Sequence, residues 1–265
     1  APGGSVGAHV DQYDVFLLQG HGHRRWQVDA GDAPPLAFRD DVELKLLRDF
    51  SPTHDWVLGP GDMLYLPPGV PHHGVAEDAC LTFSVGMRAP SRAELMVDLA
   101  EELAAALPDQ SRYADPDLAP ARDAWEIDDA AFGRLRAALS DLQSLDEDRL
   151  RAWFGRFITQ YRAGGEIDAP ARVPDAEALA RGLDQGGILL RHPHSRVAWA
   201  RHGRGARLFA NGLGLSLGIA DARRLAAAER LDAAGLAALG ARGRETLQTL
   251  VAAGHYQLVK PRRKR

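Results

Sequence analysis

Residues 7–26 read GAHVDQYDVFLLQGHGHRRW, and residues 60–74 read PGDMLYLPPGVPHHG. The first stretch places His9 and Asp11 two residues apart, and the second places His72 in a turn rich in Pro and Gly. Two imidazoles and one carboxylate brought to one point form a face that binds non-haem Fe(II) and leaves positions open for chemistry. We therefore predict a divalent metal site made of these three side chains.

The sequence around these ligands has the pattern of β-strands. Short runs rich in Val, Leu, Tyr and Phe are bounded by Gly, Pro and Asp from residue 7 to residue 88. Because successive side chains of a strand point to opposite faces, His9, Asp11, Tyr13, Val15 and Leu17 are expected to share one face. We expect strands over residues 13–19, 24–28, 57–66 and 80–87. Repeated short strands with hairpin-like turns favour a barrel or sandwich over a parallel sheet.

An arginine on the next expected strand, Arg24, suits 2-oxoglutarate as a co-substrate. Three open iron positions accommodate 2-oxoglutarate, which chelates through its keto oxygen and adjacent carboxylate, and leave one position for O2. The far carboxylate then needs a buried cation, and the planar fork of an arginine stays charged and binds bidentately. Alternation puts Arg24 on the apolar face with Trp26, and Arg25 on the outer face. We therefore expect Arg24 to bind the co-substrate, with Thr82 or Ser84 donating a hydroxyl hydrogen bond.

The periodicity changes from two to that of a helix at Ser91. Glu94 follows Ser91 at the spacing of a capping box, and a helical pattern then continues to residue 107. Further helices are expected over residues 130–145, 149–161, 175–183, 222–230 and 242–253, and strands over residues 188–191, 197–201, 207–210 and 256–259. The helices before residue 165 have wide apolar faces, which could pack on the barrel or on a second copy of the chain.

These patterns predict an α+β protein of three parts. Residues 1–90 form a barrel, residues 91–165 a helical region, and residues 166–265 a winged-helix-like unit with a basic tail. The Gly- and Pro-containing stretch at residues 164–174 predicts the boundary of the last unit. A chain of 265 residues is long enough for one substantial core and a second, smaller unit.

Composition excludes several classes of protein. The lone cysteine, Cys80, excludes an intrachain disulfide and suits a reducing compartment, so we expect the cytoplasm. No apolar run approaches the roughly 18 residues of a membrane span, and no signal peptide pattern begins the chain. Residues 1–165 carry 15 Lys and Arg against 27 Asp and Glu, whereas residues 166–265 carry 17 against 9. An acidic front could favour a basic substrate, and the tail at residues 260–265 could contact nucleic acid.

Several motifs together resemble a known family. Gly3-x5-His9-x-Asp11 and Gly61-x5-Pro67-x-Gly69-x2-His72 resemble the two metal-binding motifs of cupin barrels. Added to these are FSVGMRAPSRAEL at residues 83–95, SRYADP at residues 111–116 and WFGRFITQ at residues 153–160. The set resembles the bacterial JmjC-type ribosomal oxygenases over nearly the whole chain, most specifically in the first 90 residues.

The resemblance implies an Fe(II)- and 2-oxoglutarate-dependent double-stranded β-helix, a helical dimerisation region and a C-terminal winged helix. Bacterial members hydroxylate the β-carbon of an arginine in a large-subunit ribosomal protein. Carried over, the metal ligands are His9, Asp11 and His72, and the co-substrate arginine is Arg24. Family members have a longer part before the first ligand, including the first barrel strand, so we expect a chain truncated at its N-terminus. His23 and Thr82 depart from the residues expected at their positions.

The leading hypothesis is therefore a dioxygenase that hydroxylates a ribosomal protein, acts as a homodimer and uses Fe(II), 2-oxoglutarate and O2. One alternative is a cupin-type metalloenzyme or small-molecule binder that does not use 2-oxoglutarate. A second is a non-catalytic protein that binds nucleic acid or the ribosome through its winged-helix-like end and basic tail. Binding of 2-oxoglutarate at Arg24 distinguishes the first hypothesis from both alternatives.

Overall fold

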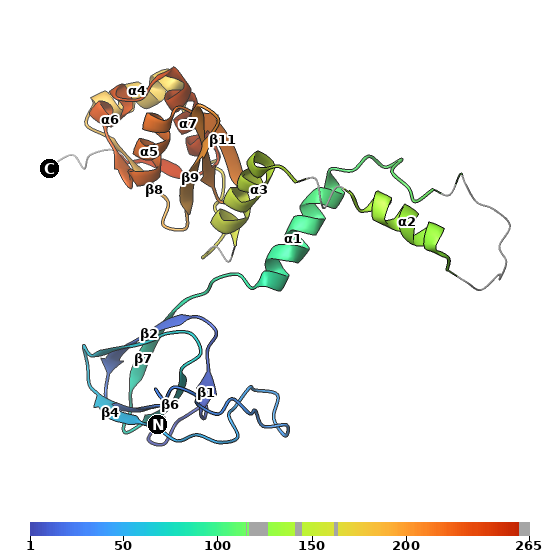
Figure 1. Cartoon of the computed structure of the whole chain (residues 1–265). Helices are drawn as coiled ribbons and strands as arrows, with labels where there is room; N and C mark the ends of the chain where they lie inside the picture. Colours follow the sequence, from blue (N-terminus) through green and yellow to red (C-terminus); the bar gives the residue numbers. More distant parts are fainter. Residues whose placement is uncertain (115, 117–126, 141–144, 162–163, 260–265) are drawn as a thin grey trace. The chain divides into compact units, whose positions relative to one another are not determined.

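The structure, a computed structural model, describes residues 1–114, 116, 127–140, 145–161 and 164–259. The chain divides into two compact units, residues 1–91 and residues 92–265 (Figure 1). Within the described part, no helix has the length and apolar character needed to cross a membrane. The predicted basic tail at residues 260–265 lies outside the described residues. The further division predicted at residue 165 stays a prediction.

The first unit is built from two antiparallel sheets with the strand orders β1-β6-β3-β4 and β5-β2-β7. The strands are β1 (His9–Val10), β2 (Asp14–His21), β3 (Arg24–Val28), β4 (His54–Leu58), β5 (Met63–Leu66), β6 (Pro71–Ala76) and β7 (Leu81–Met87). Val15, Leu17 and Leu66 from one sheet pack in one core with Trp26 and Val28 from the other. Burying each of these side chains stabilises the fold by about 1.5–3 kcal/mol. The arrangement confirms the predicted cupin-like barrel.

Two strand predictions were wrong in detail. The single strand face expected to run from His9 to Leu17 is divided, because the chain leaves one sheet after Val10 and enters the other at Asp14. The expected strand over residues 57–66 is likewise two strands, β4 and β5, which lie in different sheets. Between them the backbone turns at Gly61, whose φ of 95° is a conformation that a glycine adopts without strain.

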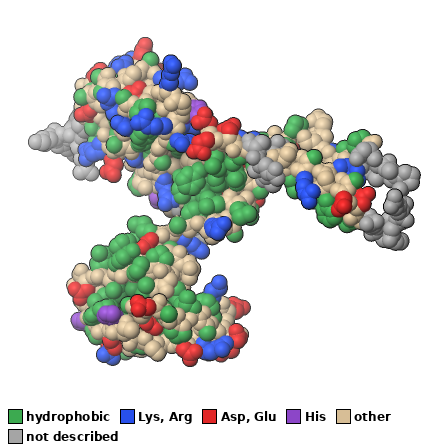
Figure 2. All heavy atoms as spheres, viewed as in Figure 1, with side chains coloured by type: hydrophobic (Ala, Val, Ile, Leu, Met, Phe, Trp, Pro, Cys, Tyr) green, Lys and Arg blue, Asp and Glu red, His purple; other side chains and the backbone are tan. Residues whose placement is uncertain are grey.

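Strand β7 turns its polar side chains toward the cavity, with Thr82 half-buried and Ser84 exposed, and its apolar side chains to the outer surface. Thr82 and Ser84 stand opposite Gln19 and Leu17 of β2, so they share the inward face. The alternate residues Phe83 and Val85 are 52% and 49% exposed. Figure 2 shows apolar side chains gathered on the surface of this unit over β2 and β7. A polar inner face is typical of a binding cavity rather than of a packed core.

The second unit contains helices and two small antiparallel sheets, of orders β11-β10-β9 and β12-β8-β13. Its helices are α1 (Arg92–Ala105), α2 (Asp129–Ala138), α3 (Glu147–Gln160), α4 (Ala176–Asp184), α5 (Ile219–Ala227), α6 (Ala233–Ala237) and α7 (Ala241–Ala252). Its strands are β8 (Ile188–Arg191), β9 (Val197–His202), β10 (Gly205–Ala210), β11 (Leu213–Leu217), β12 (Arg230–Leu231) and β13 (Tyr256–Val259). Leu189, Leu208, Leu225, Leu247 and Leu250 are fully buried in one core, which is formed by the elements from α4 onward.

Most predicted helices of this unit are present, with shifted ends. Asp146 and Asp175 cap α3 and α4 by accepting hydrogen bonds from Arg149 N and Ala178 N, which fixes where these helices begin. The helix expected to reach residue 145 ends at residue 138, and residues 141–144 lie outside the described part. The helix expected over residues 222–230 runs instead over residues 219–227, and strand β12 follows it. Strands β11 and β12 and helix α6 were not predicted.

We expect His255 to make the second unit sensitive to acid. His255 is buried, with 3% of the residue exposed, and its Nδ1 lies 2.9 Å from Ser195 Oγ. Burial lowers the pKa of His255, and His192 and Arg191 act in the same direction. The unfolded chain takes up this proton near pH 6.5, so folding loses stability as pH falls through about 6.5 toward the lower folded pKa.

The measurement is thermal unfolding of the wild type and of His255→Asn at about pH 7.5 and about pH 5.5. Asn keeps a polar nitrogen near Ser195 but cannot titrate, so the variant should lose less thermal stability on acidification. His72 and His73, whose pKa values are also lowered by burial, titrate in both proteins and cancel in the comparison. Equal losses in the two proteins would contradict the assignment to His255.

Candidate metal centre

The three predicted ligands meet at the end of one sheet. Strand β1 pairs with β6 so that His9 stands directly opposite His72, with ring centroids 4.3 Å apart. Asp11 follows β1 by one residue, and its Oδ2 lies 3.8 Å from His72 Nε2. One ligand atom from each of the three residues lies within 4.8 Å of the other two. The geometry therefore brings together two imidazoles and one carboxylate, as the spacing predicted.

Backbone carbonyls orient both imidazoles. His9 Nδ1 lies 2.9 Å from Gly7 O, and His72 Nδ1 lies 3.0 Å from Val70 O. A carbonyl oxygen can only accept, so each Nδ1 carries the hydrogen and donates it. Each Nε2 is then left with a lone pair. This is the arrangement in which a second hydrogen bond fixes the tautomer of a metal-binding histidine.

Electrostatics keep these ligands in the forms that bind a metal. Burial lowers the pKa of His72, while its hydrogen bond to the Val70 carbonyl acts in the opposite direction. The neutral imidazole is therefore favoured. Burial also raises the pKa of Tyr13, and Asp11 raises it further through its charge and a hydrogen bond. The protonated phenol of Tyr13 thus faces the Asp11 carboxylate, a contact that the sequence analysis missed.

The ligands open onto a cavity of about 260 Å³. It is lined by Val6, Gly7, His9, Asp11, Leu17, Arg24, Trp26, His72, Gly74, Thr82 and Ser84. All six residues proposed from the sequence for the metal or the co-substrate are among these. The lining thus combines a metal-binding face, a cation and two hydroxyls.

Arg24 has unused hydrogen-bonding capacity inside this cavity. Its Nη2 donates to Gly74 O at 2.9 Å, and its guanidinium carbon lies 5.1 Å from the centre of the Trp26 ring. Among the described residues, Arg24 Nε and Trp26 Nε1 are buried donors that have no hydrogen-bond acceptor. A buried unpaired donor is costly, and an anionic ligand would satisfy it. Arg25 points the other way, with Nε 3.0 Å from Asp55 Oδ1.

Other histidines do not join the cluster. Three of them in the first unit pair with side chains elsewhere: His73 with Ser5, His23 with Asp78, and His54 with Thr53. In the second unit the rings of His192 and His194 contact each other, with centroids 5.2 Å apart. Within the described part of the chain, no further group of three His, Cys, Asp or Glu side chains has metal-binding geometry.

Comparison with known proteins places this geometry in context. Residues 1–95 match the JmjC domain family, and residues 137–257 match the ROXA-like winged helix family. The ribosomal protein uL16 3-hydroxylase of Escherichia coli (strain K12) is 35% identical over 199 residues, which are 74% of this chain and 52% of that protein. The chain therefore spans about half the length of this relative.

Solved structures agree over nearly the whole chain. The crystal structure of Escherichia coli ribosomal oxygenase YcfD superposes with a TM-score of 0.73 at 32% identity, covering 98% of this chain and 68% of that one. A structure of YcfD in complex with cobalt and 2-oxoglutarate superposes with a TM-score of 0.71 at 31% identity, covering 97% of this chain and 68% of that one.

We predict that Gly74→Ala damages the cavity but not the metal ligands. A Cβ at residue 74 would lie 2.6 Å from the Trp26 ring and 2.7 Å from Arg24 Nε, so one of these side chains must move. Binding of 2-oxoglutarate to the Mn(II)-loaded protein, measured by calorimetry, should weaken by about tenfold, or about 1.4 kcal/mol. Gly133→Ala is the control, because nothing lies within 4 Å of a Cβ there. Unchanged binding of 2-oxoglutarate by Gly74→Ala would show that the position of Arg24 does not determine the affinity for this ligand.

Proposed function

The chain belongs to the bacterial ribosomal oxygenases, which combine a JmjC domain with a ROXA-like winged helix, and we propose that it is a 2-oxoglutarate-dependent dioxygenase. Its proposed substrate is a ribosomal protein of the large subunit, hydroxylated on a side chain, with the β-carbon of an arginine as the first candidate. The E. coli relative is named as a uL16 3-hydroxylase, which supports this choice. The balance of 15 basic against 27 acidic residues in residues 1–165 also suits a basic substrate. A ribosomal substrate supports the cytoplasm as the location.

The observation that carries the proposal is the metal-binding cluster facing the same cavity as a buried, partly unpaired arginine. His9, Asp11 and His72 would hold Fe(II) through two Nε2 atoms and a carboxylate oxygen. Bound Fe(II) would supply the chemistry in which 2-oxoglutarate is converted to succinate and CO2 by O2. One oxygen atom of O2 enters succinate, and the other is inserted into a substrate C–H bond to give a hydroxyl. The structure of Escherichia coli YcfD in complex with cobalt and 2-oxoglutarate supports a divalent metal and 2-oxoglutarate as the proposed ligands of this cavity.

The chain's own residues position the co-substrate and keep the ligands in order. Arg24 would bind the far carboxylate through its guanidinium, and a hydroxyl from Thr82 or Ser84 would add a second contact. The Gly7 and Val70 carbonyls hold the two imidazoles with Nε2 toward the metal. Trp26, packed in the core, lines the cavity beside Arg24 and holds the guanidinium against its ring.

The two alternatives have less support. A cupin-type metalloenzyme that does not use 2-oxoglutarate would leave the buried Arg24 Nε without a purpose. A nucleic-acid-binding protein would depend on the basic tail at residues 260–265, which lies outside the described residues. Its winged-helix-like end alone does not favour nucleic acid, since such domains often bind proteins.

We also propose that the protein is a homodimer formed through its helical region. Helices α1 and α3 are joined by a hydrogen bond of 2.7 Å from Trp153 Nε1 to Asp98 Oδ1. Beside this contact lies a groove lined by Leu95, Met96, Leu99, Leu150, Arg151, Trp153 and Phe154. Met96 is 70% exposed and Phe154 is 44% exposed. Apolar side chains gathered in this way favour a second copy of the same helices as their partner.

Light scattering during size-exclusion chromatography tests the dimer. The wild type should elute with the mass of two chains, and Phe154→Glu should elute as one chain, because a charge buried in the interface is costly. Leu36→Glu is the control, since Leu36 is 49% exposed and lies in the first unit. A wild type with the mass of a single chain, or a Phe154→Glu variant that remains dimeric, would refute the proposed interface.

The activity is tested by succinate formation and by mass spectrometry. Incubation with large-subunit ribosomal proteins should yield succinate and add one oxygen to one protein, on an arginine. His9→Ala and Asp11→Ala should each reduce turnover by at least about a hundredfold, because a lost metal ligand exceeds the 10- to 100-fold cost of a lost outer partner. Arg24→Ala should raise the KM for 2-oxoglutarate strongly.

Arg25→Ala is the matched control for Arg24→Ala, because Arg25 is the adjacent arginine on the outer face. It should retain both turnover and affinity for 2-oxoglutarate. Undiminished turnover in His9→Ala or Asp11→Ala would sink the metal assignment. Metal binding without any binding of 2-oxoglutarate by the wild type would favour the cupin-type alternative.

A further inference from the structure

Gln19 is a fully buried polar side chain that the proposed reaction does not yet use. It lies on β2, next to the turn into β3, with no exposed surface. Its backbone is fixed on both sides, since Gln19 N donates to Asp62 O at 2.9 Å and Gln19 O accepts from Gly61 N at 2.8 Å. A buried amide persists only when its polar atoms are paired, so each of its partners is informative.

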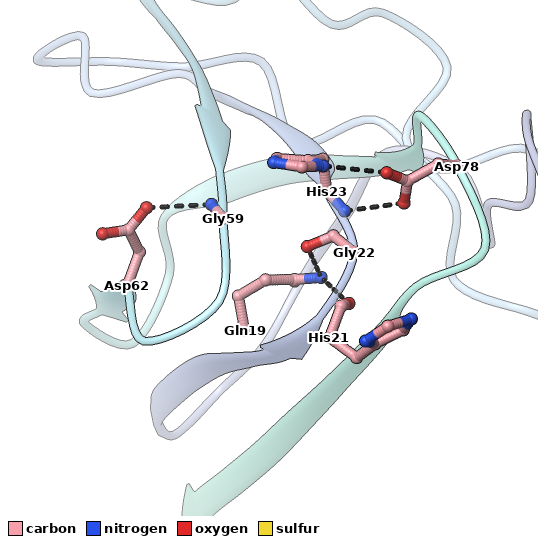
Figure 3. Close-up of polar contacts among 7 residues, drawn as sticks. All are labelled: Gln19, His21, Gly22, His23, Gly59, Asp62 and Asp78. Atoms are coloured by element: carbon pink, nitrogen blue, oxygen red, sulfur yellow. Dashed lines mark hydrogen bonds and ion pairs between the residues drawn. The ribbon is translucent and has the colours of Figure 1, made fainter.

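The amide of Gln19 can adopt only one orientation. Its Nε2 donates to His21 O at 2.7 Å and to Gly22 O at 3.0 Å, as Figure 3 shows. Both partners are carbonyl oxygens that only accept, so the nitrogen must face them. The other end, Oε1, then faces the Thr82 hydroxyl at 2.7 Å. Because an amide oxygen cannot donate, Thr82 must give its hydrogen to Gln19.

The two carbonyls that fix the amide are themselves held in place. The pairing of β2 with β7 shifts register between Gln19 and His21, which leaves the turn outside the regular ladder. Asp78 clamps this turn by accepting from His23 N at 2.7 Å and pairing with His23 Nδ1 at 2.8 Å (Figure 3). The His21 and Gly22 carbonyls therefore cannot turn away from the Gln19 amide without breaking these contacts.

The fixed Gln19 amide determines which of the two β7 hydroxyls can donate a hydrogen bond to a ligand in the cavity. Thr82 and Ser84 share the inward face of the strand and line the same cavity. With its hydrogen committed to Gln19, Thr82 turns only lone pairs toward the cavity, and lone pairs repel a carboxylate. Ser84 makes no side-chain hydrogen bond within the described residues, so its hydrogen is free to turn toward a ligand.

We propose that Gln19 is a positioning residue that gives the hydroxyls of Thr82 and Ser84 different roles. It holds the Thr82 hydrogen away from the cavity, so that Ser84, together with Arg24, is the donor to the far carboxylate of the co-substrate. Thr82 stabilises the cavity wall through its hydrogen bond to Gln19 and does not bind the ligand. This inference rests on the proposed use of 2-oxoglutarate, and it selects one of the two hydroxyls that the alternation of β7 leaves equivalent.

The test is calorimetric binding of 2-oxoglutarate to the Mn(II)-loaded protein without O2. Ser84→Ala should weaken binding by about tenfold, because a hydrogen bond to a charged group is lost. Thr82→Val, of nearly the same shape as threonine, should change it by no more than about twofold while lowering the thermal midpoint, because the Gln19 oxygen loses its donor. The Kd for Mn(II) alone should be unchanged in both variants.

A double substitution separates positioning from simple structural support. In Gln19→Met the Thr82 hydroxyl is free to turn, so adding Thr82→Val in that background should weaken 2-oxoglutarate binding severalfold, although it has little effect in the wild type. A purely structural role for Gln19 predicts the same small effect of Thr82→Val in both backgrounds. If Gln19→Met does not fold, Ser84→Ala and Thr82→Val still decide which of the two hydroxyls donates to 2-oxoglutarate.

The outcomes distinguish this inference from the function on which it rests. A wild type that binds Mn(II) but no 2-oxoglutarate overturns the proposed function and this inference with it. A wild type that binds 2-oxoglutarate overturns this inference alone if Thr82→Val weakens binding tenfold, or if Ser84→Ala leaves it unchanged. Weakening by Ser84→Ala alone, with an unchanged Kd for Mn(II), supports it.

Discussion

The antiparallel pairing of β1 with β6 is the contact on which the metal centre depends. It sets His9 opposite His72 and Val10 opposite Pro71, and β1 has no further residues. Flanking backbone bonds hold this short strand in place, from Gly69 N to Asp11 O at 2.8 Å and from Leu47 N to Ala8 O at 2.8 Å. A slip of one residue would turn His9 to the opposite face of the sheet and separate it from His72. The metal centre is therefore a consequence of strand register.

Much of the candidate site could be predicted from residue spacing alone. The HxD pair and the distant histidine define the ligands, and alternation along β3 separates Arg24 from Arg25 because Trp26 and Val28 fix which face is buried. The corner between Val10 and Asp14 could not be predicted. A period of two assumes one continuous strand, whereas the chain crosses there from one sheet to the other. The ligands converge all the same, because Asp11 lies at that corner beside His9.

Other features are invisible to periodicity for physical reasons. On β7 the usual rule is inverted, with Thr82 and Ser84 facing the cavity and Phe83 on the outer surface, since the space enclosed at this point is an open cavity and not a core. The role of Gln19 depends on carbonyls in a clamped turn and on a hydroxyl 63 residues away, which spacing does not reveal. In the second unit, strong helical periodicity located α3 and α4, whereas a two-residue strand and a five-residue helix are too short to leave a pattern.

Charge balance in the cavity links the metal to the co-substrate. With both imidazoles neutral, as metal binding requires, the lining contributes one negative charge from Asp11 and one positive charge from Arg24. A divalent cation alone leaves the cavity with two excess positive charges, and a dicarboxylate alone leaves two excess negative charges. When both are bound the sum returns to zero, and the unpaired Arg24 Nε gains an acceptor. Because excess charge in a partly buried site is costly, each group should favour the binding of the other, as linkage requires. The arginine thus does more than recognise a carboxylate, since it makes the empty lining neutral and the doubly occupied site neutral as well.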